Sequence, residues 1–370
     1  MSVIRGDLFD VLPTLEAESI DALVTDPPYE LGFMGKAWDG SGVAVRAETW
    51  RAVARVLKPG AYLLAFGGTR TFHRVACAIE DAGFEIRDCL SWLYGQGFPK
   101  SLNLPGGLGT ALKPSWEPIV LARKPFKGTV RANVEQHGTG ALNIDACRLQ
   151  SGESTARPSG VNQGIYGSDD RRGMIRGGDD GRWPANVCLD EFAAMALDEQ
   201  SGELVDGVAV KSNTPVGKVT GHIFQLGNTG KDVTYGGAGG ASRFYYVAKP
   251  SRAERDYGCE RLPLVSPLEV TGRAEGSAGS KHARDGMTGR PRANLHPTVK
   301  PVELMRWLVR LVTPPGGTVL NPFCGSGTTG MACRYEQRLF IGIEREAEYH
   351  AIAEARIAAV APLFGNGDAA

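Results

Sequence analysis

The stretch Ile20-Asp21-Ala22-Leu23-Val24-Thr25-Asp26-Pro27-Pro28-Tyr29 carries the strongest structural signal near the start of the chain. Residues 20–24 form an apolar run typical of a short buried strand, and two consecutive prolines must end it because neither can donate to a ladder. The Pro27 and Pro28 carbonyls are left free to accept hydrogen bonds. A carboxylate, fixed carbonyls and an aromatic ring at the carboxyl end of a strand suit an amino group on a planar heterocycle.

The same residues allow a plainer interpretation. A Pro-Pro turn can place an Asp that satisfies its own backbone and a Tyr that lies at the rim. This segment alone does not choose between a binding site and a turn, so the rest of the chain has to decide.

Residues 1–125 alternate strand-like and helix-like segments. The predicted strands are 3–4, 20–24, 61–66, 84–92 and 116–122, and the predicted helices are 47–57 and 71–82. Such alternation is typical of parallel strands joined by crossover helices. We therefore expect an α/β sheet with helices on both faces.

Residues 126–290 differ in composition, because Gly, Ser, Asp and Arg dominate them. Strand-like islands are predicted at 141–144, 185–189 and 244–247. An insertion of this length with so few core residues is expected either to wrap a partner or to lack a fixed fold in part.

Regular patterning returns in residues 291–360. A predicted helix, 302–312, precedes a strand, 318–320, which leads into Asn321-Pro322-Phe323-Cys324-Gly325-Ser326-Gly327-Thr328-Thr329-Gly330. A short helix, a strand ending on Glu344 and a last helix, 347–360, follow. The loop fits G-x-G-x-x-G, and an acid on the neighbouring strand can accept hydrogen bonds from ribose hydroxyls. Dinucleotide sites and adenosyl-methionine sites both use this pattern, whereas the absence of G-x-x-x-x-G-K-[ST] excludes an ATP-binding P-loop.

Composition limits the class of protein. Hydrophobic residues at 42% and charged residues at 22% are ordinary for a soluble globular chain, and no apolar run approaches the roughly 20 residues of a membrane span. No secretory signal is visible, and the seven scattered cysteines indicate free thiols in a reducing, cytoplasmic compartment without a zinc site. Net charge is zero, but residues 98–131 and 271–300 are locally basic, as a surface that follows phosphates requires.

The order of the motifs resembles a known family. Asp26-Pro27-Pro28-Tyr29 near the N-terminus, a long insertion, His296-Pro-Thr-Val-Lys-Pro301 and then the glycine loop are similar to the β-group, circularly permuted, of amino-group DNA methyltransferases. The resemblance covers residues 1–125 and 291–360. It implies a Rossmann-like class I methyltransferase fold with a mainly parallel, seven-stranded sheet.

The resemblance also implies a division of the chain. Residues 1–125 would be the catalytic half, 126–290 the inserted target-recognition region, 291–362 the half that binds S-adenosyl-methionine, and 363–370 a tail. Double-stranded DNA is the implied substrate, and a second copy of the chain and a restriction enzyme are candidate partners.

Site residues follow from the same resemblance. The catalytic set is Asp26, Pro27, Pro28 and Tyr29. The set implied to bind S-adenosyl-L-methionine is Asp7, His296, Lys300, Pro301, Asn321, Pro322, Phe323, Gly325, Gly327, Thr328, Thr329 and Glu344. The family often has Asp where this chain has Asn321, so a charge near the cofactor ammonium is lost.

The implied chemistry is methylation of an exocyclic amine. Asp26 and the Pro27 carbonyl would each accept one N–H of a flipped base stacked on Tyr29, which frees the nitrogen lone pair for attack on the sulfonium methyl. Phe33 and Trp38 are candidates to close the pocket. No metal and no cysteine nucleophile are required, and Cys77 and Cys89 are expected in the core.

The sequence leaves the target base and the class of activity open. In the family, Asp at the first motif position is typical of adenine N6 and Ser of cytosine N4, so Asp26 favours adenine. An RNA or protein-glutamine amine methyltransferase, an NAD-dependent oxidoreductase and a DNA-binding module without catalysis are the other interpretations.

Overall fold

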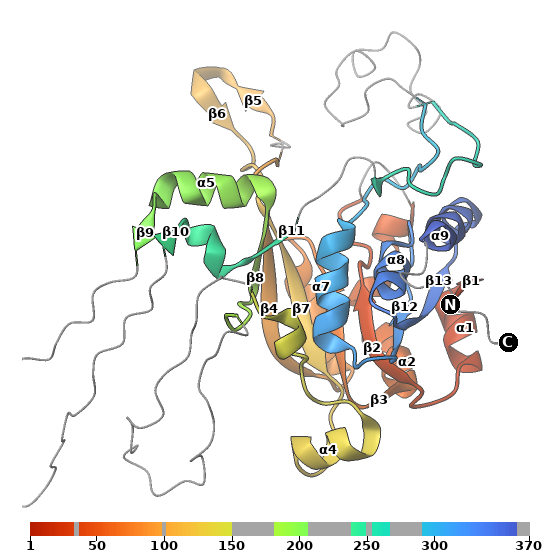
Figure 1. Ribbon diagram of the computed structural model, residues 1–370. Helices are drawn as coiled ribbons and strands as arrows, with labels where there is room; N and C mark the ends of the chain where they lie inside the picture. Colours follow the sequence, from red (N-terminus) through yellow and green to blue (C-terminus); the bar gives the residue numbers. More distant parts are fainter. Residues whose placement is uncertain are drawn as a thin grey trace, which may run out of the picture.

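The computed structural model describes residues 1–32, 37–97, 101–149, 181–205, 238–248, 254–266 and 291–360. Its centre is one nine-stranded sheet (Figure 1). The spatial order is β1 (Ser2–Arg5), β13 (Leu339–Glu344), β12 (Thr318–Asn321), β2 (Ile20–Thr25), β3 (Leu57–Phe66), β7 (Trp116–Arg123), β4 (Glu85–Leu93), β8 (Val187–Asp190) and β11 (Tyr246–Ala248). All of these strands except β7 run parallel to one another, so the predicted α/β class with a mainly parallel sheet is confirmed.

Helices cover both faces of the sheet because its central strands are apolar on both sides. In β2, Ala22 and Val24 pack into one core cluster and Leu23 packs into the other. The first cluster contains residues of α7 (Val302–Val312), α8 (Thr328–Tyr335) and α9 (Ala347–Ala359). The second contains residues of α1 (Leu8–Val11), α2 (Ala47–Val56) and α3 (Phe72–Asp81). The predicted elements 20–24, 302–312 and 339–343 agree with the structure to within a residue.

Strand β7 corrects the expectation that residues 1–125 alternate in parallel. It pairs antiparallel with β3 on one side and with β4 on the other. The segment 94–115 between β4 and β7 contains no crossover helix among its described residues, and a chain that returns without a crossover must pair antiparallel. The segment contains a small hairpin instead, β5 (Asn103–Leu104) and β6 (Leu108–Gly109).

The sheet has nine strands where seven were predicted, because residues 126–290 contribute two of them. Strand β8 pairs with β4, and β11 pairs with β8, both in parallel. They extend the edge that β4 would otherwise expose. The division of the chain at residues 125 and 290 stays a prediction, although part of the proposed recognition region shares the sheet of the catalytic half.

Two local expectations were wrong. Residues 141–144 form no strand but a turn, in which the Asn143 amide nitrogen donates to the carbonyls of Arg310 (2.9 Å) and Thr313 (2.6 Å) at the end of α7. Cys77 is exposed and Cys89 is only half-buried, so neither is a core residue.

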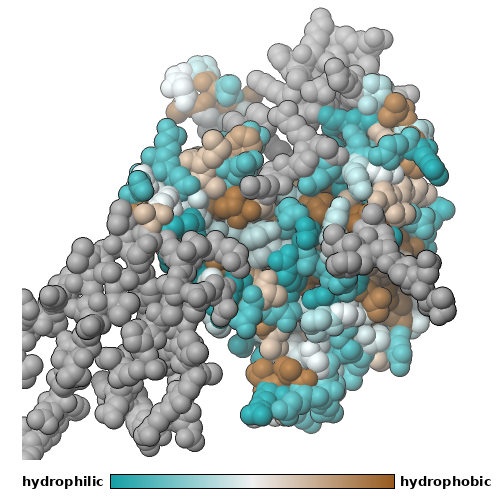
Figure 2. Space-filling view, in the orientation of Figure 1, coloured by the Kyte–Doolittle hydropathy of each residue, from teal (hydrophilic) through white to brown (hydrophobic). Residues whose placement is uncertain are grey.

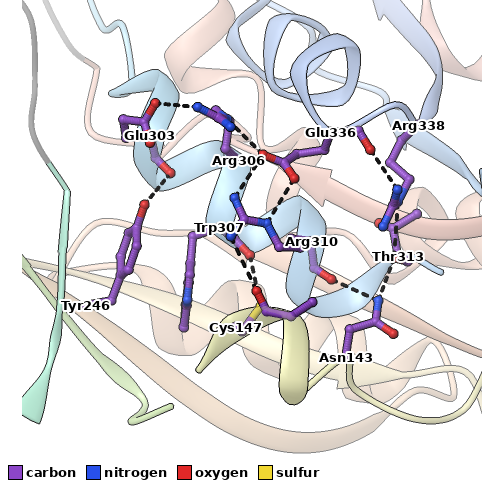
Figure 3. Close-up of polar contacts among 11 residues, drawn as sticks. Asn143, Cys147, Tyr246, Glu303, Arg306, Trp307, Arg310, Thr313, Glu336 and Arg338 are labelled. Atoms are coloured by element: carbon purple, nitrogen blue, oxygen red, sulfur yellow. Dashed lines mark hydrogen bonds and ion pairs between the residues drawn. The ribbon is translucent and has the colours of Figure 1, made fainter. Parts of the chain in front are cut away.

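Helix α7, in the half of the chain that contains the glycine loop, contacts strand β11 of the insertion (Figure 3). The Tyr246 hydroxyl donates to the Glu303 carbonyl at 3.0 Å, and the Tyr246 ring stacks on Trp307 with centroids 5.1 Å apart. On the same helix, Arg306 and Arg310 both bind Glu336 at the end of α8, at 2.8 and 2.9 Å. Strand β11 is therefore fixed to α7, which is fixed to the loop-bearing half.

Among the helices that the structure describes, none has the length and apolar character to cross a membrane. The described residues also contain no group of three His, Cys, Asp or Glu side chains placed to hold a metal ion.

Candidate active site

Asp26 lies directly after β2, beside the end of β12. The two strands are neighbours in the sheet, and the Thr25 hydroxyl donates to the Asn321 side-chain oxygen at 2.7 Å. The turn after β2 and the glycine loop after β12 are thus adjacent at the carboxyl edge of the sheet, where open α/β sheets bind ligands.

One carboxylate oxygen of Asp26 is engaged and the other is not. Oδ2 accepts a hydrogen bond from the Lys300 ammonium at 2.6 Å. Oδ1 is buried, and no hydrogen-bond partner for it is present in the described structure. A buried acceptor without a partner costs free energy, on the order of 1–3 kcal/mol, which indicates that a ligand donor completes it.

Lys300 connects Asp26 to two further groups. Its Nζ donates to the Tyr29 hydroxyl at 3.1 Å and lies 3.3 Å from Oε2 of Glu117. The Tyr29 hydroxyl in turn donates to the same Glu117 oxygen at 2.9 Å. Burial lowers the pKa of Lys300, but the two carboxylates outweigh it and the net pKa is raised, so the ammonium stays protonated. Burial and both carboxylates raise the pKa of Tyr29 well above its ordinary value, so its hydroxyl stays neutral.

Glu117 is a residue that the sequence did not single out. It is the second residue of β7, and its only signal in the sequence was that it is the one acid in a basic segment. Because β7 runs antiparallel, its beginning lies at the carboxyl edge of the parallel strands, and this places Glu117 beside Tyr29.

The backbone around Tyr29 is held by Asp39, which is almost fully buried. One Asp39 carboxylate oxygen accepts the N–H of Tyr29 at 2.8 Å and that of Glu30 at 3.1 Å, and the other accepts the N–H of Leu31. The Thr71 hydroxyl donates to the Tyr29 carbonyl at 2.6 Å. The tyrosine ring is therefore fixed at both ends. Trp38 packs against a small core cluster and stacks on His296, so its part in closing the pocket stays a prediction. Phe33 lies outside the described residues.

Asn321 shapes the glycine loop from inside. Its side-chain oxygen accepts from the Phe323 N–H at 3.1 Å as well as from Thr25, and its amide donates to the Thr329 hydroxyl at 2.9 Å. The amide group thus donates and accepts at once, which a carboxylate in this position would not do. Gly325 and Gly327 both have positive φ, of 54° and 77°, which explains why the loop needs glycine there.

Glu344, at the end of β13, binds the loop with both oxygens. Oε2 accepts the Gly325 N–H at 2.7 Å, and Oε1 accepts the Glu346 N–H at 2.9 Å. Burial raises the pKa of Glu344, while these two N–H groups oppose the rise. Asp7 follows β1 next to this strand end, and its side chain accepts the Phe9 N–H as the cap of α1.

His296 lies against the glycine loop. A Cβ at Gly325 would come within 2.7 Å of the His296 ring, so the contact leaves no room for a side chain there. The His296 Nδ1 bonds to the Thr298 carbonyl at 2.6 Å, and burial lowers the pKa of the imidazole to about 4. The ring is therefore neutral, with Nδ1 as donor and Nε2 free to accept.

Arg356 is the second functional candidate that sequence reasoning missed. Its side chain is fully buried behind the loop, where Nη1 donates to the Ser326 carbonyl at 2.6 Å and to the Thr328 hydroxyl at 3.0 Å. Burial lowers its pKa to about 10. Nothing in the sequence indicated that Arg356, within the predicted last helix 347–360, faces the interior.

A small cavity of about 40 Å³ lies between the turn after β2 and the glycine loop. Its lining residues come from both halves of the chain: Asp26, His296, Thr298, Lys300, Met305, Asn321, Phe323, Cys324, Gly325, Ser326, Thr328 and Thr329. Among the predicted residues outside this lining, Tyr29 contacts the lining residue Lys300, and Glu344 contacts the lining residue Gly325. Pro301 is the N-cap residue of α7, and Asp7 caps α1. Pro27, Pro28, Pro322 and Gly327 lie within the two turns without lining the cavity.

The donor set suits the predicted methyl donor. Asp26 offers a buried carboxylate oxygen, Oδ1, beside the glycine loop. The neutral His296 and the carboxylate of Glu344 add the acceptors that an amino-acid group and a ribose would need.

Comparison with known proteins gives the following. Residues 20–355 match the family model for N6/N4 methylases, described as DNA methylase. The chain is 44% identical over 68 residues to the type II methyltransferase M.XycI of Xanthomonas campestris pv. cyanopsidis, covering 18% of this chain and 23% of that protein. It is 42% identical over 74 residues to YubD of Escherichia coli (strain K12), named as a methylase, covering 20% and 33%. The matched segments thus span a third or less of these relatives.

Among solved structures, the PvuII DNA methyltransferase, titled cytosine-N4-specific, is similar in fold. The TM-score is 0.50 at 15% sequence identity, over 100% of this chain and 88% of that one. At this identity the likeness concerns the fold.

Proposed function

Because this chain belongs to the DNA methylase family, whose model matches residues 20–355, we propose that it transfers a methyl group from S-adenosyl-methionine to an exocyclic amine in double-stranded DNA. Membership confirms the predicted family and its cofactor. The observation that carries the proposed activity is the unpartnered Oδ1 of Asp26, buried in the cavity that also contains the glycine loop.

The target amine is activated by hydrogen bonds. Its lone pair is delocalised into the base, so it is a poor nucleophile until its two N–H groups are held out of the ring plane. Oδ1 of Asp26 accepts one N–H, and the Pro27 carbonyl, which no donor from the described residues reaches, accepts the other. Bound in the cavity, S-adenosyl-methionine would supply a methyl group on a sulfonium, so that an N–C bond would form as the C–S bond breaks. The nitrogen would then release its extra proton, which Oδ1 of Asp26, as its hydrogen-bond acceptor, would take up.

Lys300 and Glu117 have positioning roles in this scheme. Lys300 binds Oδ2, and this contact leaves Oδ1 as the carboxylate oxygen available to a ligand in the cavity. Glu117 forms a second ion pair with Lys300 and accepts the hydrogen bond of the Tyr29 hydroxyl. The Tyr29 ring therefore presents a fixed face to an extruded base.

The remaining cofactor contacts are assigned by family resemblance together with position. Glu344 retains lone pairs for the ribose hydroxyls, and Asp7 lies at the neighbouring strand end for the adenine. His296 and Thr328 line the cavity, and we propose that they contact the methionine group there. Lys300 was predicted to bind the cofactor, and its contact with Asp26 extends its proposed role to the carboxylate of the catalytic set.

We propose adenine N6 as the target, since Asp26 is the family's typical residue for adenine. Cytosine N4 is the second candidate, because the PvuII enzyme of similar fold is cytosine-N4-specific. Residues 126–290 are proposed to read the DNA sequence, and a cytoplasmic setting with a cognate restriction enzyme or a second copy as partner fits a type II relative. Incubation with mixed-sequence DNA and labelled cofactor, followed by nucleoside mass spectrometry, distinguishes N6-methyladenine from N4-methylcytosine.

The central test is Asp26→Ala. It should reduce methyl transfer below detection while the binding of S-adenosyl-homocysteine, measured by calorimetry, changes by less than about threefold. Asp10→Asn, which removes an exposed carboxylate on α1, serves as the control. Substantial turnover by Asp26→Ala would sink the assignment, and binding of NAD in place of the methyl donor would favour an oxidoreductase.

A further inference from the structure

A small hairpin projects from the edge of the sheet that contains the candidate active site. Residues Asn103–Leu104 pair with Leu108–Gly109 around a turn at Pro105–Gly107, and the hairpin stands away from the body of the molecule (Figure 1). Leu104 and Leu108 face each other across the two strands and are 41% and 65% exposed. Figure 2 shows apolar side chains on this projection.

The base of the hairpin is continuous with the catalytic network. It leaves β4 at Leu93 and returns to β7 at Trp116, where Glu117 follows directly. Two contacts close the base: the Tyr94 N–H donates to the Ser115 carbonyl at 2.9 Å, and Lys113 Nζ donates to the Gly95 carbonyl at 2.6 Å. Because β4 is parallel to β2, its carboxyl end lies at the same edge as Asp26.

The hairpin is too small to contribute much to the stability of the fold. A two-stranded ribbon with two pairs of residues is marginal in water, and large apolar side chains at an exposed tip lose the benefit of burial. About nine residues separate Ser115 from Gly106, so the tip can reach at most roughly 30 Å from the sheet, which exceeds the width of a DNA groove, about 12 Å. Residues 101–115 contain Lys113 and no acid, so nothing in the segment repels phosphates.

A flipped base leaves a gap in the duplex, and proteins that open base steps insert apolar side chains such as Leu into the stack. We propose that Leu104 and Leu108 form a wedge that enters the base stack next to the target and occupies the space of the extruded base. This inference rests on the proposed function and adds a device for opening DNA that is separate from the methyl-transfer groups.

The test compares paired with already unpaired targets. The double variant L104A/L108A is assayed on a duplex with the methylation site found by sequencing, and on the same duplex with an abasic site opposite the target base. We expect kcat/KM to fall at least tenfold on the paired duplex and less than threefold on the abasic one, since no base pair has to be opened there. On a duplex with 2-aminopurine at the target position, the wild-type protein should give the fluorescence increase that reports base flipping. The L104A/L108A variant should not give it.

Two controls separate the wedge from general damage. L104M/L108M keeps apolar bulk and should retain most of the wild-type rate. L339A removes an exposed leucine at the start of β13, at the opposite edge of the sheet, and should leave the rate unchanged.

The outcomes are distinct. The wedge would be overturned if kcat/KM of L104A/L108A fell equally on both duplexes or did not fall on the paired duplex. It would also be overturned if light scattering showed that the substitutions convert a wild-type dimer into a monomer. In each case the wild-type enzyme still methylates DNA. If the wild-type chain methylates no DNA at all, the proposed function itself falls, and the wedge with it.

Discussion

Glu117→Gln is the substitution that most directly tests the network around Lys300. Glutamine keeps an acceptor for the Tyr29 hydroxyl, which donates to Glu117 at 2.9 Å, but removes the negative charge 3.3 Å from Lys300. With an effective dielectric constant of about 20, the Coulomb attraction lost at this distance is about 5 kcal/mol. Part of it is offset, because Lys300 keeps its ion pair with Asp26 and glutamine is cheaper to bury, so we expect a net loss of about 1–3 kcal/mol in folding stability.

The effect on activity follows from the redistribution of charge. Without Glu117, the whole positive charge of Lys300 acts on Asp26, and this weakens Oδ1 as an acceptor for the amine. We expect kcat to fall about tenfold, equivalent to about 1.4 kcal/mol, with the KM values for DNA and cofactor within about threefold of wild type.

A pH profile separates this role from simple destabilisation. Asp26 and Glu117 together raise the pKa of Lys300, so removal of one carboxylate lowers that pKa and moves the alkaline limb of the rate profile to lower pH. The control is Glu85→Gln, which breaks a similar ion pair with Arg123 on the neighbouring strands. An unchanged pH profile, or an activity loss no larger than that of Glu85→Gln, would refute the positioning role.

Two further predictions concern the loop. Burial lowers the pKa of His296 to about 4, against 6.5 in an unfolded chain, so folding stability should be full above pH 6.5 and fall towards pH 4, by at most about 3 kcal/mol. Urea unfolding at pH 7 and 4.5 should show a smaller difference for His296→Gln than for wild type; an equal difference would exclude His296 as the cause. Arg356→Met leaves the buried Ser326 carbonyl without its donor, and we expect a loss of about 3 kcal/mol in stability and at least tenfold weaker binding of S-adenosyl-homocysteine by calorimetry. Unchanged affinity in a folded Arg356→Met would show that the arginine does not shape the cofactor site.

Local signals in the sequence placed the elements that carry the site. Two prolines in the proposed catalytic turn end β2, and the glycine pattern with the acid of Glu344 marks the loop after β12. Amphipathic spacing gave the bounds of α7 to the residue. These features depend on the conformations open to single residues and on periodicity, which any short segment expresses without its tertiary partners.

Local signals in the sequence could not predict which strands pair or in which direction. An apolar run has the same appearance whether its neighbour is parallel or antiparallel, so the reversal of β7 could not be predicted, and neither could the addition of β8 and β11 to the sheet. The reversal matters for the proposed function because it brings the beginning of β7, and with it Glu117, to the edge of the sheet where Asp26 and Tyr29 lie.

What the sequence by itself determined is therefore the pair of motifs, their order and the family that uses them. What only the tertiary structure decided is which charges meet: Asp26 and Lys300 are 274 positions apart in the chain, and Thr25 and Asn321 are 296 apart. Ion pairs and hydrogen bonds act over a few ångströms, and the folded sheet alone brings groups so distant in sequence within that range.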